Sequence, residues 1–425
     1  MVTAENDSRL FPQLTIHKPL GTIKTKSMRT TKLVLFLISI SIISCRTESK
    51  KKEQTTEKTI EIVSDFNNSK INELDSLIHK LVSEKKTAGF ALGIQIGNAE
   101  PITKEYGFAD LETNKKVKPF HQFRIASITK PFTATAILKL IEMKELSLDD
   151  KLDEFFPNYP NGQNISIYQL LSHTSGIPNW WNGGMPENEP KNFPMCKNPH
   201  QYLQEMKNIS LFEPGEFYKY SNSGYVLLGE IIEKISGQSY EKFLSENIFE
   251  PAGMTKTEME HIERVSENWV NGYALDNEKE NPFIKPEIYH MPFSAGGLRS
   301  TTTDLLNFVS SLNSNKIIET NLVKDMITYG KLNNGKPNYE GYYVPEGSKP
   351  RKSYDEIKKS GYGFGLNLME LYQNPVFYHS GGIAGFNSYL IHIPKSNSTV
   401  IFLANTENGI IPELKEILKV VTEIE

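Results

Sequence analysis

The feature that most constrains this chain is a serine and a lysine at the head of an apolar helical stretch, Ser127–Leu146. Apolar side chains recur through the stretch at helical spacing, which predicts a helix buried in the core of a globular domain. Those side chains are Ile128, Phe132, Ile137, Leu140 and Ile141. Positions i and i+3 share one face of a helix, so the Lys130 amine can reach the Ser127 hydroxyl. Because a serine attacks well only when a base takes its proton, the pair is a candidate nucleophile beside a candidate base.

The Ser-x-x-Lys pattern is not specific on its own, because three more matches begin at Ser49, Ser83 and Ser239. The first lies in a charged linker, the second near the end of a surface-type helix, and the third before an ordinary exposed helix. The assignment to Ser127 therefore depends on partner motifs elsewhere in the chain.

One partner motif is Tyr220-Ser221-Asn222, which lies between a turn and a helical run. Its tyrosine is a candidate general base or proton relay, and its asparagine is a candidate for orienting a substrate amide or Lys130. Further Tyr-x-Asn matches begin at Tyr159 and Tyr372, so this signal also depends on its context.

A second partner motif is His379-Ser380-Gly381-Gly382, which ends a strand-like run and holds the only His-x-Gly of the chain. Glycines let a substrate carbonyl approach the edge of a strand. There the Gly382 N–H can pair with that of Ser127 as an oxyanion hole.

These three motifs, in this order, resemble those of the penicillin-binding protein and β-lactamase superfamily of serine hydrolases. The likeness is to the branch of class C β-lactamases, D-alanyl-D-alanine carboxypeptidases and related esterases, and it extends from about Lys70 to the C-terminus. Further matching segments are LLSHTSG at 170–176, FEPG at 212–215 and SAGGL at 294–298, followed by Asp304.

The resemblance implies a role for each motif residue. Ser127 would be the acylated nucleophile and Lys130 its proton acceptor. Tyr220 would serve in acylation and in activating the deacylating water, with Asn222 beside it. The N–H groups of Ser127 and Gly382 would form the oxyanion hole. Whether Tyr220 or Lys130 holds the proton at each step stays open, because their titrations are coupled.

The third motif departs from the pattern of the β-lactamases, which commonly carry Lys-Thr-Gly where this chain has His379-Ser380-Gly381. A histidine is largely neutral at pH 7, whereas a lysine is a cation suited to a substrate carboxylate. The departure disfavours efficient β-lactam hydrolysis and leaves peptidase or esterase activity open. A rival motif, Lys359-Ser360-Gly361, is followed by YGFG, which the superfamily carries on the strand before its third motif, so we favour His379.

The remaining pattern predicts an α+β fold, with an antiparallel sheet flanked by helices and an all-helical insert over about residues 125–290. Strand-like runs cover residues 89–97, 102–108, 386–393 and 399–403. Amphipathic patterns predict helices over residues 71–82 and 414–421. This arrangement matches the fold of the superfamily, in which the nucleophile lies where sheet and helices meet.

The N-terminal segment has the pattern of a bacterial lipoprotein. Its apolar run Leu33–Ile43 is too short to span a bilayer but fits a secretory signal, and Ile42-Ile43-Ser44-Cys45 resembles a lipobox. We expect an extension over 1–27 upstream of the true start, a signal peptide over 28–44, lipidation at Cys45, a flexible tether over 45–69 and a hydrolase domain over 70–425. A plain signal peptide or a retained anchor is the alternative, and the choice between Met1 and Met28 as the start stays open.

Charge and composition limit the kinds of ligand and partner that the protein is expected to bind. Residues 1–60 hold 11 Lys and Arg against 5 Asp and Glu, so the formal charge of −4 leaves −10 on the remainder. An acidic body without a basic stripe argues against nucleic-acid binding. No cluster shows metal-ligand spacing and no phosphate-binding glycine loop is present, so we expect no metal and no cofactor.

The sequence thus predicts an envelope serine hydrolase that acts through an acyl-enzyme on cell-wall-type D-amino-acid peptides or small esters. It would be anchored to the membrane through a lipid on Cys45 and face the periplasm or exterior. The alternatives are a β-lactamase and a catalytically silent binding lipoprotein on the same fold. We expect His173 to stabilise the turn after its helix, and the loop Asn179–His200 to lie near the mouth of the cleft.

Overall fold

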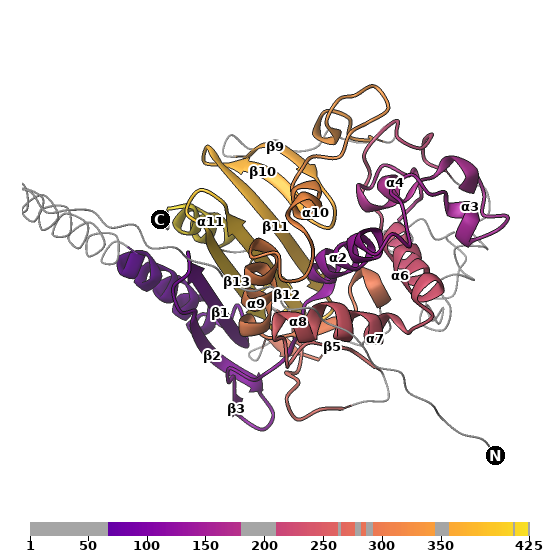
Figure 1. The fold of residues 1–425 in the computed structure, drawn as a ribbon. Helices are drawn as coiled ribbons and strands as arrows, with labels where there is room; N and C mark the ends of the chain where they lie inside the picture. Colours follow the sequence, from indigo (N-terminus) through magenta and orange to yellow (C-terminus); the bar gives the residue numbers. More distant parts are fainter. Residues whose placement is uncertain are drawn as a thin grey trace, which may run out of the picture. The chain divides into compact units, whose positions relative to one another are not determined.

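An eight-stranded antiparallel sheet organises the domain, in the order β3-β2-β1-β13-β12-β11-β10-β9 (Figure 1). The computed structural model describes residues 67–179, 210–261, 265–276, 282–285, 292–344, 357–410 and 413–423. The strands are β1 (Gly89–Ile96), β2 (Ile102–Asp110), β3 (Lys115–Lys116), β9 (Ile357–Tyr362), β10 (Asn367–Leu371), β11 (Asn374–Ile383), β12 (Phe386–Ile393) and β13 (Ser398–Ala404).

The sheet joins the two ends of the domain, because β1 pairs with β13 from Phe90↔Ala404 to Ile96↔Ser398. All seven residues of β13 are buried, as expected for a central strand covered on both faces. The predicted strand pairs are confirmed, since β1 pairs with β2 and β12 with β13.

Two helical layers cover the two faces of the sheet. The helix over residues 67–83 and α11 (Leu414–Thr422) pack against one face, which receives Phe90, Leu92 and Ile94 from β1. Ala91 points to the opposite layer, which contains α2 (Thr129–Glu142) and α9 (Thr302–Asn313). The alternation along β1 follows from the two-residue period of a strand.

The helical part lies between β4 and β8 in the chain. Its described helices are α2, α3 (Leu152–Phe155), α4 (Ile167–Leu171), α6 (Asn222–Ser236), α7 (Tyr240–Leu244), a π-helical turn Ser245–Phe249 and α8 (Glu250–Ala252). After β8 follow α9 and α10 (Thr320–Met326). Short strands β4 (Phe123–Arg124), β8 (Leu298–Ser300) and β5 (Glu258–Met259) form a three-stranded sheet, and β6 (Ala274–Leu275) pairs with β7 (Phe283–Ile284). The predicted α+β class is confirmed; within residues 125–290, the described helices end at Ala252 and two-residue strands follow.

Several predictions about the N-terminal segment fall outside the described residues. They are the extension over 1–27, the signal peptide over 28–44, Cys45, and the tether as far as residue 66. Residues 67–69, assigned to the tether from sequence, already belong to the first described helix. Among the helices of the described residues, none has the length and apolar character needed to span a bilayer.

Candidate active site

Ser127 lies in a tight turn that the sheet supports from behind. The turn is a 3₁₀ segment, Ala126–Ile128, directly before α2, and Ala126 has a positive φ of 47°. Ser388 of β12 donates to the Ile125 carbonyl at 3.0 Å. Gly381 of β11 leaves room for that carbonyl, because a Cβ there would lie 2.1 Å from its oxygen. The glycine of the third motif is therefore needed for the close approach of strand and turn.

Lys130 is fully buried in the first turn of α2, with its amine directed at three oxygen atoms. Its Nζ lies 3.1 Å from Ser127 Oγ, 2.7 Å from Asn222 Oδ1 and 2.6 Å from the Ala295 carbonyl oxygen. Burial lowers the pKa of Lys130 well below its usual range, because the charged ammonium loses its hydration. The amine is therefore poised to be neutral beside the Ser127 hydroxyl.

Tyr220 completes the group around the serine. Its ring centroid lies 4.9 Å from the Nζ of Lys130, and that amine also contacts Ser127 Oγ. Burial raises the pKa of the Tyr220 phenol, so the resting side chain is protonated. Between the two candidate bases, this favours Lys130 for the resting enzyme and gives Tyr220 a proton to donate.

Hydrogen bonds and a ring contact join the Tyr220-Ser221-Asn222 motif to the segment that follows α4. The Ser221 N–H donates to His173 Nδ1 at 3.2 Å, and the His173 ring packs 4.4 Å from the Tyr220 ring, centroid to centroid. Asn179 Oδ1 accepts from both the backbone N–H and the Nδ2 of Asn222, each at 3.1 Å. His173 thus contacts the second motif as well as its own turn. Asn179 begins the loop that we expected near the mouth of the cleft, and it lies at the site; residues 180–200 of that loop lie outside the described residues.

His379 is buried behind the cavity and does not line it. Its Nδ1 lies 2.8 Å from the Ser380 carbonyl oxygen, which can only accept, so Nδ1 carries the proton. Its Nε2 then accepts from the Tyr362 hydroxyl at 3.0 Å. Burial, together with the nearby Lys130, lowers the pKa of His379 to about 3. The ring is therefore neutral, and it supplies no cation for a substrate carboxylate.

The rival motif lies elsewhere. Lys359 is on β9, the edge strand of the sheet, and β10 separates it from β11. Its exposed ammonium pairs with Glu370 at 3.3 Å. The fold brings the His379 motif, and not Lys359-Ser360-Gly361, up to the serine.

The three motifs meet at a cavity of about 210 Å³, which we call the Ser127 cavity. Gly382 opens into it, and a Cβ at this position would meet no atom within 4 Å. Among the described residues that line the cavity, none carries a formal charge. They are Ala126, Ser127, Asn179, Tyr220, Asn222, Pro292, Ala295, Gly296, Gly382 and Ile383.

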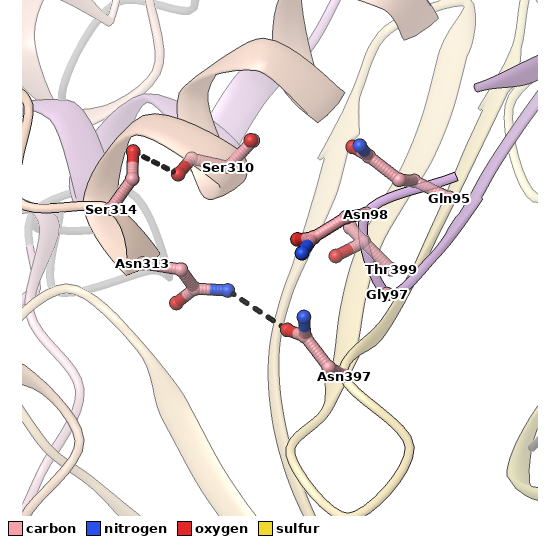
Figure 2. Close-up of a pocket in the computed structure, with 8 residues that line it drawn as sticks. All are labelled: Gln95, Gly97, Asn98, Ser310, Asn313, Ser314, Asn397 and Thr399. Carbon is pink, nitrogen blue, oxygen red and sulfur yellow. Dashed lines mark hydrogen bonds between the residues drawn. The ribbon is translucent and has the colours of Figure 1, made fainter. Parts of the chain in front are cut away.

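A second, smaller pocket of about 140 Å³ lies where the end of α9 faces the β1–β2 and β12–β13 turns, and we call it the amide pocket (Figure 2). Its lining consists of uncharged amide and hydroxyl side chains and one glycine: Gln95, Gly97, Asn98, Ser310, Asn313, Ser314, Asn397 and Thr399. The amides of Asn313 and Asn397 form a long hydrogen bond of 3.4 Å across it.

Known protein sequences are similar to this chain over most of its length. The sequence model of the β-lactamase family matches residues 74–416. Penicillin-binding protein 4* of Bacillus subtilis (strain 168) is 30% identical over 315 residues, which cover 71% of this chain and 64% of that protein. Protein flp of Staphylococcus aureus (strain N315) is 28% identical over 355 residues, which cover 81% and 65%. The chain thus spans less than two thirds of the length of these relatives.

Solved structures share the fold. An octameric penicillin-binding protein homologue from Pyrococcus abyssi matches with a TM-score of 0.66 and 27% identity, covering 81% of this chain and 77% of that one. The D-amino acid amidase of Ochrobactrum anthropi SV3, complexed with L-phenylalanine amide, matches with a TM-score of 0.67 and 23% identity, covering 84% and 98%. With the family match over most of its length, the chain belongs to the β-lactamase family of serine hydrolases.

Proposed function

We propose that this protein hydrolyses amide or ester bonds through an acyl-enzyme on Ser127. The observation that carries the proposal is the set of oxygen atoms around Lys130. A neutral amine has two N–H donors and one lone pair. The Asn222 and Ala295 oxygens can only accept, so they take the two N–H groups. The lone pair is then left for the hydroxyl of Ser127, 3.1 Å away.

Acylation follows from this arrangement. The Lys130 lone pair takes the Ser127 proton while Oγ attacks the substrate carbonyl carbon. The carbonyl oxygen becomes an oxyanion, which the N–H groups of Ser127 and Gly382 stabilise. Tyr220 donates its phenolic proton to the leaving nitrogen or oxygen and recovers one from the Lys130 ammonium. The bond to the leaving group breaks, and an ester on Ser127 remains.

Deacylation runs the same proton path in reverse. Water attacks the ester carbonyl carbon while Tyr220 and Lys130 together take up its proton. The Ser127–acyl bond breaks, and that proton returns to Ser127 Oγ. The products are the free acid and the resting enzyme, so each proton taken up is released within one turnover.

We propose further that the favoured substrates are uncharged on the leaving-group side, as D-amino-acid amides, internal peptide bonds or small esters are. The neutral, buried His379 and the uncharged lining of the described cavity support this, since neither offers a cation to a terminal carboxylate. The names of the relatives, penicillin-binding protein and D-amino acid amidase, support amide chemistry.

Two measurements test this function. First, intact mass after treatment with a fluorophosphonate should show a single adduct on the wild type and none on Ser127→Ala; an unlabelled but folded wild type contradicts the proposal. Second, kcat/KM is compared for an N-acyl-D-alanyl-D-alanine and for its C-terminal amide. The amide should be the better substrate, and a preference for the free acid would contradict the proposed leaving-group side.

We also propose that the protein is a lipoprotein of the bacterial envelope, anchored through Cys45. The apolar run Leu33–Ile43 and the lipobox-like residues before Cys45 support this. Two or more acyl chains anchor a protein stably. Labelling of growing cells with an alkynyl fatty acid should mark the wild type, and Cys45→Ala should lose both the label and the membrane fraction. Equal labelling of both would contradict the anchor.

A further inference from the structure

We infer that Asn179 is a positioning residue for acylation: its side-chain oxygen fixes the orientation of the Asn222 amide and thereby reserves the Lys130 lone pair for Ser127. The inference rests on the proposed function, because its effect is on the acylation of Ser127. It concerns a residue outside the three motifs that lines the Ser127 cavity and contacts Asn222.

The orientation of the Asn179 amide follows from a backbone group. The N–H of Asn222 lies 3.1 Å from the Asn179 side chain and can only donate, so the Asn179 atom that faces it must be the oxygen. The same oxygen lies 3.1 Å from the side-chain amide of Asn222. That second contact is favourable only if Asn222 presents its Nδ2 to Asn179.

The orientation of Asn222 decides what Lys130 meets. With Nδ2 turned to Asn179, the Asn222 oxygen faces Lys130 Nζ at 2.7 Å. In the flipped amide, an NH₂ group would face the amine, and the lone pair of a neutral Lys130 would turn toward that donor. The amine would then have no lone pair for the Ser127 proton. The acceptor on Asn179 therefore selects the arrangement in which Lys130 can act as a base.

The backbone at this point is held independently of the Asn179 side chain. The Pro178 carbonyl accepts from the hydroxyls of Ser221 at 3.3 Å and Ser223 at 2.7 Å. These bonds fasten residues 178–179 to the start of α6 on either side of Asn222. A substitution at Asn179 therefore removes the amide acceptor while the Pro178 contacts hold the two segments together.

Two substitutions separate positioning from mere packing. Asn179→Leu keeps the size and removes the acceptor. We expect the second-order rate of fluorophosphonate labelling of Ser127 to fall about tenfold, as for a lost pair of hydrogen bonds that act in the transition state. Asn179→Asp keeps the acceptor and adds a negative charge that stabilises the Lys130 ammonium. Its labelling rate should recover toward wild type at alkaline pH, with the acidic limb of the pH–rate profile moved to higher pH.

A double-mutant cycle completes the test. In the background of Asn222→Ala there is no amide to orient, so adding Asn179→Leu should cause no further loss of labelling rate. Asn313→Leu, in the amide pocket, is the matched control and should label like the wild type, and thermal melts confirm that each variant is folded. The inference is overturned if folded Asn179→Leu labels at the wild-type rate, or if it causes the same loss with and without Asn222. Failure of the wild type itself to label would instead overturn the proposed function.

Discussion

The Ser127 cavity and the amide pocket both present uncharged amide and hydroxyl side chains, and they differ in the groups that those side chains contact. The amine of Lys130 is buried, with hydrogen bonds of 2.6 to 3.1 Å. In the amide pocket Asn98, Asn313 and Asn397 are exposed, and the bond between the last two measures 3.4 Å (Figure 2). Exposed amides exchange their partners for water at little cost. A polar lining is therefore not enough for catalysis. Burial lowers the proton affinity of the Lys130 amine, and its fixed hydrogen-bond partners direct its lone pair.

The largest expected effect comes from removing the buried amine. Lys130→Met has a similar length and no lone pair on nitrogen, so we expect the rate of fluorophosphonate labelling to fall by about a thousandfold, within the range for loss of a general base. If the folded variant kept a labelling rate within tenfold of the wild type, the buried amine would not be the base that activates Ser127, and this difference between the two pockets would have no consequence for reactivity.

An added methyl group should have very different effects at the two neighbouring glycines of β11, Gly381 and Gly382. Gly381→Ala places a Cβ 2.1 Å from the Ile125 carbonyl oxygen, so we expect the free energy of unfolding to fall by about 1 to 3 kcal/mol. Gly382→Ala meets nothing within 4 Å and should change the free energy of unfolding by less than about 0.5 kcal/mol. Chemical denaturation of the two variants measures the difference, and equal losses would contradict the close packing of turn against strand.

The buried, neutral His379 should make the free energy of unfolding fall in acid. The pKa of His379 is about 3 in the folded protein, against 6.5 when exposed, so only the unfolded chain gains this proton between those values. Stability must therefore fall as pH drops from 6.5 toward 3. Over the window from pH 6.5 to 5 this group alone should cost roughly 2 kcal/mol. His379→Gln should flatten the slope of unfolding free energy against pH, with the exposed His79→Gln as control; an unchanged slope would contradict the neutral ring.

The smallest effect is expected in the amide pocket. Asn313→Ala removes an exposed group that is joined to Asn397 by a long bond, so it should shift the free energy of unfolding by less than about 0.5 kcal/mol. Labelling of Ser127 should be unchanged. A loss of several kcal/mol, measured by denaturation, would show that exposed amides here are coupled as tightly as the buried groups at Ser127.

Much of the fold was predictable, because burial leaves a periodic trace in the sequence. The apolar spacing after Ser127 identified α2, and the alternating runs identified β1, β2, β12 and β13. The short strand β5 has two residues, too few to show a period. It exists because of its pairing with β8, which a local pattern does not record.

The partners of Lys130 show where sequence reasoning stops. Ser127 is three residues away on the same helical turn, and its contact followed from spacing. The Ala295 carbonyl is 165 residues away and belongs to the backbone, which every residue type possesses. The contact of Asn179 with Asn222 was equally unpredictable, since an asparagine at the start of a loop is common and its partner is 43 residues away. Side-chain type and spacing predict candidates, while the tertiary fold selects the acceptors that set protonation.

The pairing of β1 with β13 also fixes when the site can form. Residues 89–96 cannot complete their place in the sheet until residues 398–404 exist, so the central ladder closes a loop of about 300 residues. Such long-range pairing makes folding slow compared with helix formation. Gly381 and Gly382, on β11, are also made late, long after Ser127 and Lys130. During synthesis the serine–lysine pair therefore exists before the strand that carries Gly381 and Gly382, and the site can form only after residues 374–404 have been made.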